Sequence, residues 1–327
     1  MTWPRLTALA LALAACSREP AREHPGSASA SASVAPPVAS APPSMASASP
    51  SASAVTPPPS GGVPEGMALV PAGPFTMGAD HGGEEDEHPA HTVTIPAFYL
   101  DLTEVTNEAW DRCVAAKHCP PPDASSATKN GFGSDAAFRG PRQPVSAVAW
   151  DAARAYCAWL GKRLPTEAEW EKAARGTDAR RFPWGNDEPT ADRAVFTGHG
   201  LTADVGTHPK GDGPYGHHDL AGNVWEWVED VYDPYAYKRP GAAEGKGSSC
   251  EEALEALGDL RSQGKKGFTG SNPIPTECER VLRGGAFNYP GPGLRVTNRV
   301  HHPARYHLVM SGFRCAQSAP TGAPPRP

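Results

Sequence analysis

Seven cysteines are the residues of this sequence with the most specific chemistry. Their thiolates could bind a soft metal ion, attack a substrate or pair as disulfides. The chain has no C-x-x-C pair and no cysteine and histidine at zinc-finger spacing. Six cysteines remain apart from Cys16, which allows a full set of disulfides in an exported protein, although fifteen pairings are possible. Cys113 and Cys119 are close enough for a local bridge, while a metal site and free thiols stay open as alternatives.

The surroundings of Cys16 are typical of a bacterial lipoprotein signal. Arg5 precedes an apolar run over 6–14, which is shorter than the roughly 20 residues that a bilayer span requires. Leu13-Ala14-Ala15-Cys16 resembles a lipobox, in which cleavage precedes the cysteine and a lipid is attached to it. We therefore expect a signal peptide over 1–15, lipidation of Cys16, and an exported lipoprotein held at the cell envelope by this anchor only. The alternative is an ordinary signal peptide whose cleavage removes Cys16.

Three histidines stand close together near the C-terminus. His301, His302 and His307 alternate with Arg299 and Arg305, so the segment could bind a metal ion or an anion. The spacing is irregular for metal ligands, and a polar loop surface explains the same composition. Both interpretations stay open.

Other features exclude some functions. The net charge of −6 lacks the basic surplus typical of nucleic-acid binding, and no G-x-S-x-G or P-loop motif occurs. The acidic run over 84–87 is expected to be a solvated loop. Trp225 and Trp227 flank Glu226 and are expected to be core aromatics rather than a platform for stacking sugars.

The composition limits the elements that can position these residues. There are 37 Pro and 34 Gly in 327 residues, and both types weaken helix and strand interiors, which excludes a helical bundle or a coiled coil. Residues 16–64, after the signal, are rich in Ala, Ser and Pro and are predicted to form a disordered tether; the tail over 318–327 has the same character. The body over 65–317 is predicted to be an α+β domain with low regular content.

About three main helices are predicted by their end signals. One begins after the N-cap Thr106, one covers 150–160, and one begins at Thr166 with a Thr-x-x-Glu capping box and ends at Gly176. The insert over 241–276 is predicted to be a surface excursion with a small helix over 251–260, which Cys250 and Cys278 could tie at its base. Short strands are predicted over 68–70, 75–77, 92–95, 98–100, 281–283 and 312–315.

An ordered series of motifs runs through the body. It includes KRLPTEAEWE (162–171), GNVWEW (222–227), RGG (283–285) and GFRC (312–315). Together they resemble the formylglycine-generating enzymes, the sulfatase-modifying-factor family, over residues 65–317. The resemblance implies a fold that is related to C-type lectins and poor in regular secondary structure.

The resemblance also implies a chemistry that this chain lacks the residues to perform. Family enzymes oxidise a sulfatase cysteine with copper held by two thiolates between the RGG and GFRC motifs. No cysteine lies between Arg283 and Cys315 here, so a sulfatase-modifying oxidase is the least favoured function. The family also pairs the cysteine of the AYC motif with that of GFRC, which implies Cys157–Cys315 and leaves Cys113–Cys119 and Cys250–Cys278.

A structural calcium site is a second implication of the resemblance. By matching the GNxWEW region, its ligands are Asp219, the carbonyls of Gly222 and Val224, and Glu226. Ca²⁺ takes six to eight oxygen ligands from carboxylates and carbonyls, which these groups supply. The alternative is that Glu226 is a buried carboxylate paired with an arginine.

We therefore expect a non-catalytic, calcium-stabilised binding or scaffold module for an unknown protein or peptide ligand at the envelope. The main alternative is a metal-dependent oxidative enzyme of the non-haem iron type, as in family relatives of ergothioneine and pyoverdine biosynthesis. The histidine segment over 301–307 is the feature that favours the second interpretation, and the redox metal stays unknown.

Overall fold

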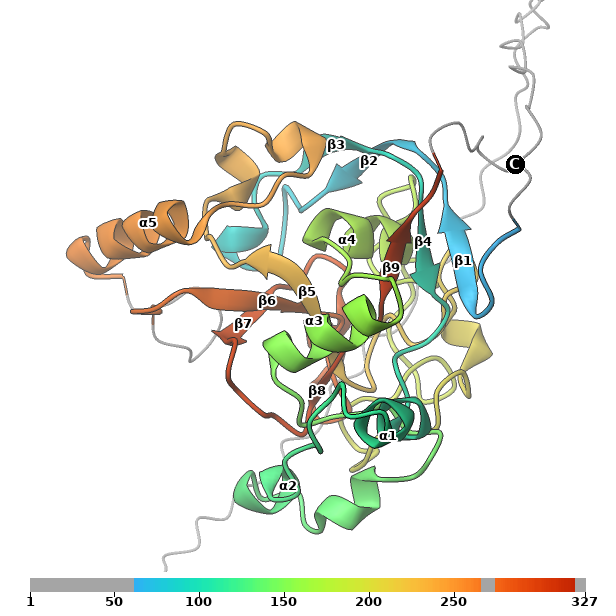
Figure 1. Ribbon diagram of the computed structural model, residues 1–327. Helices are drawn as coiled ribbons and strands as arrows, with labels where there is room; N and C mark the ends of the chain where they lie inside the picture. Colours follow the sequence, from blue (N-terminus) through green and yellow to red (C-terminus); the bar gives the residue numbers. More distant parts are fainter. Residues whose placement is uncertain (1–61, 266–273, 321–327) are drawn as a thin grey trace, which may run out of the picture. The chain divides into compact units, whose positions relative to one another are not determined.

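The computed structural model describes residues 62–265 and 274–320 (Figure 1). The expected signal peptide, Cys16 and nearly all of the tether lie outside the described residues, as does most of the expected tail. Within the described ranges, no helix is long and apolar enough to cross a membrane.

The strands form three small sheets. The first has the order β1-β4-β9, the second is the hairpin β2-β3, and the third has the order β7-β6-β5-β8, in which β5 and β8 are parallel. The strands are β1 (Met67–Val70), β2 (Gly73–Met77), β3 (His91–Ile95), β4 (Phe98–Asp101), β5 (Trp225–Val231), β6 (Glu279–Arg283), β7 (Val300–Pro303), β8 (Ser311–Gly312) and β9 (Ala316–Ser318).

The predicted helix ends are confirmed by their caps. The Thr106 side chain accepts a hydrogen bond from the Ala109 N–H, and Thr166 and Glu169 form the expected capping box. The three predicted main helices and the small helix predicted in the insert are all present, and the helix of the insert is the longest of those described. The helices are α1 (Asn107–Ala115), α2 (Ser126–Lys129), α3 (Trp150–Trp159), α4 (Glu167–Arg175) and α5 (Cys250–Ser262).

The strand predictions are less complete, since β5 and β7 were not expected. β5 reads WEWVEDV and is buried along most of its length, so it lacks the polar–apolar alternation that reveals a strand. Of the strand expected over 312–315, only Gly312 lies in a strand, β8, and residues 313–315 connect β8 to β9. Ser318 at the end of β9 belongs to the expected tail and pairs with Phe98 of β4. The last strand therefore includes the first residue of the expected tail.

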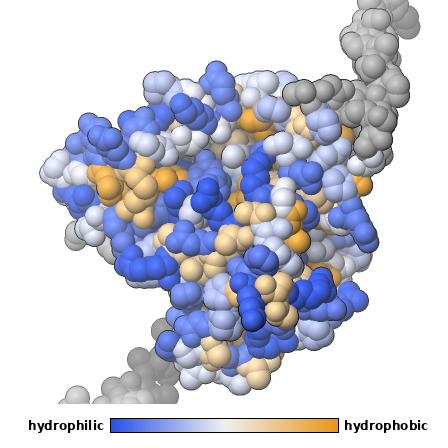
Figure 2. All heavy atoms as spheres, viewed as in Figure 1, coloured by the Kyte–Doolittle hydropathy of each residue, from blue (hydrophilic) through white to orange (hydrophobic). Residues whose placement is uncertain are grey.

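The core is divided between clusters on either side of the β5–β6 pair. Trp225 and Trp227 belong to the cluster around α1 and α3, which confirms them as core aromatics. Trp227 donates its indole N–H to the Val148 carbonyl at 3.0 Å. In the other cluster, α4 packs against the β2–β3 hairpin and against β5 and β6 (Figure 1). The face drawn in Figure 2 is mainly hydrophilic, with small separate hydrophobic patches.

Three disulfides join the described cysteines in the expected pairs. They are Cys113–Cys119, Cys157–Cys315 and Cys250–Cys278. The second joins α3 to the segment before β9 across 158 residues of sequence, whereas the first closes a separation of only 6. The third ties the base of the insert that contains α5.

The long-range disulfide should contribute most to stability, because a cross-link restricts the unfolded chain more as the closed loop lengthens. The double variant Cys157→Ala/Cys315→Ala should lose about 5 kcal/mol of unfolding free energy, and the matched control Cys113→Ala/Cys119→Ala about 2 kcal/mol. Urea unfolding of both variants measures the difference. Equal losses would contradict the role given to loop length.

Candidate functional site

The segment expected to bind calcium is a tight loop that leads into β5. Asp219, Gly222 and Asn223 all adopt left-handed backbone conformations, with φ of 57°, 88° and 59°. A Cβ atom on Gly222 would lie 2.2 Å from the Val195 carbonyl oxygen, so only glycine fits there. The loop conformation is therefore set by its close approach to the backbone at Val195.

Glu226 is buried at the start of β5 and binds an arginine. Its two carboxylate oxygens accept hydrogen bonds from Arg314 Nε and Nη2, both at 2.7 Å. The indole N–H of Trp170 donates to the same carboxylate at 3.0 Å. Of the two interpretations of Glu226, the buried carboxylate–arginine pair is the one seen, and the pair does not fit the expected role of Glu226 as a calcium ligand.

A further carboxylate, Glu104, lies in this cluster and was missed by the sequence analysis. Its Oε1 accepts a hydrogen bond from Asn223 Nδ2 at 3.0 Å, whereas its buried Oε2 accepts none from the described residues. Burial and the charge of Asp219 hold the pKa of Glu104 well above its usual range. Asp219 itself accepts the Gly206 N–H at 2.6 Å. No spacing or motif in the sequence indicates that Glu104 belongs to this cluster, because its neighbours come from the distant loop around Asn223.

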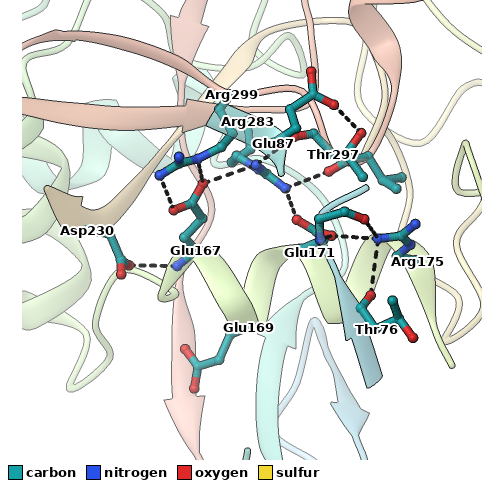
Figure 3. Close-up of polar contacts among 12 residues, drawn as sticks. Thr76, Glu87, Glu167, Glu169, Glu171, Arg175, Asp230, Arg283, Thr297 and Arg299 are labelled. Atoms are coloured by element: carbon teal, nitrogen blue, oxygen red, sulfur yellow. Dashed lines mark hydrogen bonds and ion pairs between the residues drawn. The ribbon is translucent and has the colours of Figure 1, made fainter. Parts of the chain in front are cut away.

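A larger buried ion network centres on α4 (Figure 3). Glu167 accepts hydrogen bonds from Arg299 Nε at 2.7 Å and Nη2 at 3.0 Å, and from Arg283 Nη1 at 3.1 Å. One turn later, Glu171 pairs with Arg283 and with Arg175 Nη1, the latter at 2.9 Å. The spacing of four residues places both carboxylates on one helix face, toward β6 and the segment that precedes β7.

The acidic run over 84–87 is only partly the solvated loop that was expected. Asp86 and Glu87 are fully buried. Asp86 accepts the Tyr232 hydroxyl at 2.8 Å, and Glu87 accepts Arg295 Nη2 at 2.7 Å and the Thr297 hydroxyl at 2.5 Å. The expectation was wrong for these two residues because their partners are more than a hundred residues away in the sequence.

The three histidines do not meet at a common point. The buried His301 places Nδ1 2.6 Å from Glu279 Oε2 and stacks on Tyr232, while burial lowers the pKa of His302 to about 4. His307 is exposed. Among the residues that the structure describes, no group of three or more His, Cys, Asp or Glu side chains is arranged to hold a metal ion.

Asp230, at the edge of the ion network, provides a test of the electrostatics. Its Oδ2 accepts the Glu167 N–H at 2.6 Å (Figure 3), and burial and the Glu167 charge raise its pKa from 3.8 to about 7. The folded state therefore binds this proton more tightly than the unfolded state does. The contribution of Asp230 to stability is greatest below pH 4 and is lost as the pH rises from about 4 to about 7.

The variant Asp230→Asn should remove this loss. Relative to the unaltered chain, its unfolding free energy should rise between pH 4 and pH 8 by up to roughly 4 kcal/mol, measured by urea unfolding at several pH values. The control Asp178→Asn changes a largely exposed carboxylate and should not rise in this way. A constant difference between Asp230→Asn and the unaltered chain would contradict the raised pKa.

Comparisons with known proteins agree with the resemblance of the motifs. Residues 53–319 match the family model described as the sulfatase-modifying factor enzyme 1-like domain. A hercynine oxygenase of Mycolicibacterium smegmatis is 32% identical over 279 residues, which cover 76% of this chain and 60% of that protein. The inactive C-alpha-formylglycine-generating enzyme 2 of Mus musculus is 32% identical over 213 residues, which cover 50% of this chain and 68% of that protein.

The fold comparison points the same way. The structure of PvdO from Pseudomonas aeruginosa superposes with a TM-score of 0.58 at 25% identity, covering 77% of this chain and 94% of that one. This similarity confirms the expected fold class. The chain spans only 60% of the length of the hercynine oxygenase from Mycolicibacterium smegmatis. From its motifs, its family match and its fold, this chain belongs to the sulfatase-modifying factor family of formylglycine-generating-enzyme-like proteins.

Proposed function

We propose that this chain is a non-catalytic binding module of its family. The observation that carries the proposal is the state of its cysteines: all six of those described are joined in disulfides. Copper(I) is bound by soft thiolates, and the segment between Arg283 and Cys315 contains no cysteine. A relative from Mus musculus is named an inactive C-alpha-formylglycine-generating enzyme, which supports a non-catalytic role for this chain.

We further propose that the chain is an exported lipoprotein anchored through Cys16. Support comes from the lipobox-like residues before Cys16 and from the three disulfides, which are typical of oxidising compartments. The Ala/Ser/Pro-rich residues after Cys16 would then separate the domain from the membrane surface, where it would bind a protein or peptide ligand.

Oxidative catalysis with another metal is the second candidate. Names of relatives favour it, since hercynine oxygenases are 32% and 36% identical to this chain. Histidine is a common ligand for iron, and His301, oriented by Glu279, is the best placed of the three histidines to serve as one. His302 and His307 do not converge with it in the described structure.

Calcium binding at the loop over 219–226 is part of the proposal, with a changed ligand set. The open oxygen donors are Asp219, the carbonyls of Gly222 and Val224, and the free Oε2 of Glu104. Glu226 is instead neutralised by Arg314. Burial and the charge of Asp219 raise the pKa of Glu104, and a divalent cation bound between the two groups would balance the charge of both carboxylates.

Metal loading separates the binding module from the two oxidase alternatives. The variant Cys16→Ser, in which every remaining cysteine is disulfide-bonded, should neither retain copper(I) nor consume oxygen with a sulfatase-derived cysteine peptide. With iron(II) it should also consume no oxygen. Stoichiometric iron that is lost on replacing His301, His302 and His307 by alanine would contradict the binding module, and peptide oxidation with copper would contradict it as well.

Calcium should stabilise the fold by mass action. At a calcium concentration about 100 times the dissociation constant, the unfolding free energy should rise by about 2.7 kcal/mol over a chelator-treated sample. Glu104→Gln removes a ligand charge and should abolish most of this rise, whereas the control Glu108→Gln, on the exposed face of α1, should retain it. Equal unfolding curves with calcium and chelator would contradict the site.

A further inference from the structure

A cleft of about 400 Å³ lies beside the ion network and is lined by basic side chains. Its walls include Arg175, Arg181, Arg295, His81 and Thr297. The three arginines come from separate parts of the chain: the end of α4, the segment after it, and the segment between β6 and β7. The tertiary structure therefore brings three guanidinium groups from separate segments to one cleft.

Arg175 holds part of its hydrogen-bonding capacity unused. Its side chain is only 8% exposed, and Nη1 donates to the Gly78 carbonyl at 2.6 Å and to Glu171 at 2.9 Å. Nε is buried and donates to no acceptor among the described residues. A buried guanidinium N–H without an acceptor is costly, and within the described residues the protein leaves this one donor of Arg175 unsatisfied.

Arg295 has a similar set of hydrogen bonds. It donates Nη1 to the Pro292 carbonyl at 2.5 Å and Nη2 to Glu87 at 2.7 Å, while its buried Nε has no acceptor in the described part of the chain. Glu87 is held by Arg295 at 2.7 Å and by the Thr297 hydroxyl, so its negative charge is balanced within the wall of the cleft.

Arg181 is the third arginine of the cleft, and its ion-pair partner is exposed to solvent. Its guanidinium pairs with Glu188 at 2.5 Å, but the Glu188 side chain is 68% exposed. Exposed ion pairs of this kind contribute little to stability, so a better anion could replace the glutamate. The cleft is open to solvent beside the exposed Gly82, where a Cβ atom would meet no atom within 4 Å.

We propose that this arginine cleft binds a tetrahedral oxyanion, the phosphate or sulfate group of a small ligand. Guanidinium groups match such oxygens in charge and geometry, and three of them on separate segments suit an ion with several oxygens. The inference goes beyond the proposed function, because it holds whether or not the chain is a catalyst, and its test requires neither copper, iron nor calcium.

The test is calorimetric titration of the full chain with inorganic phosphate and, separately, with sulfate, against chloride at equal ionic strength. We expect saturable binding of at least one oxyanion and none of chloride; the tighter of the two identifies the preferred group. Arg181→Gln should weaken binding about tenfold, the value of one charge-assisted hydrogen bond. Arg180→Gln is the matched control, since Arg180 pairs with Asp178 and does not line the cleft.

A second variant changes binding in the opposite direction and keeps the test independent of folding. Glu188→Gln removes the charge that competes for Arg181, and it should tighten oxyanion binding while leaving the circular dichroism spectrum unchanged. The proposal is overturned if neither oxyanion binds more tightly than chloride. It is also overturned if Arg180→Gln and Arg181→Gln weaken binding equally, or if Glu188→Gln has no effect on it.

Discussion

The pairing of Arg283 with Glu167 and Glu171 is the interaction on which the rest of the structure depends. All three side chains are buried, and a buried charge without its partner is strongly destabilising. Arg283 ends β6, the two glutamates lie on α4, and Arg283 also donates to the carbonyls of Val296 and Thr297. The pairing thus requires α4, β6 and the segment before β7 to fold in one arrangement.

This constraint explains why so much of the domain can consist of loops. The segment over 284–299 has only a single 3₁₀ turn of regular structure, yet Arg295, Thr297 and Arg299 each donate to a buried carboxylate. Their partners, Glu87 and Glu167, belong to the η1 turn (Glu85–Glu87) and to α4. Hydrogen bonds from side chains therefore position backbone that no long helix or sheet supports.

A second buried pair lies at the start of β5, where Glu226 is the register partner of Arg283. Arg314 holds Glu226 and also donates to the carbonyls of Leu102 and His218, and the next residue, Cys315, is bridged to α3. The GFRC segment therefore stabilises the fold through two contacts, the ion pair of Arg314 and the disulfide of Cys315. The family's fold is kept by these contacts, which are independent of the thiols required for copper chemistry.

Features that depend on neighbouring residues were determined by the sequence alone. The capping box of α4 and the start of α1 arise from hydrogen bonds over three residues, and the absence of cysteine between Arg283 and Cys315 is read directly from the sequence. Only the tertiary structure decided the partner of Glu226, which is 88 residues away, and the burial of Glu87, whose partner Thr297 is 210 residues away. A carboxylate has the same sequence signature whether it faces water, an arginine or a cation. Its role is set by which distant groups the packed core brings to it, and the Glu104 carboxylate and the arginine cleft became visible for this reason only in three dimensions.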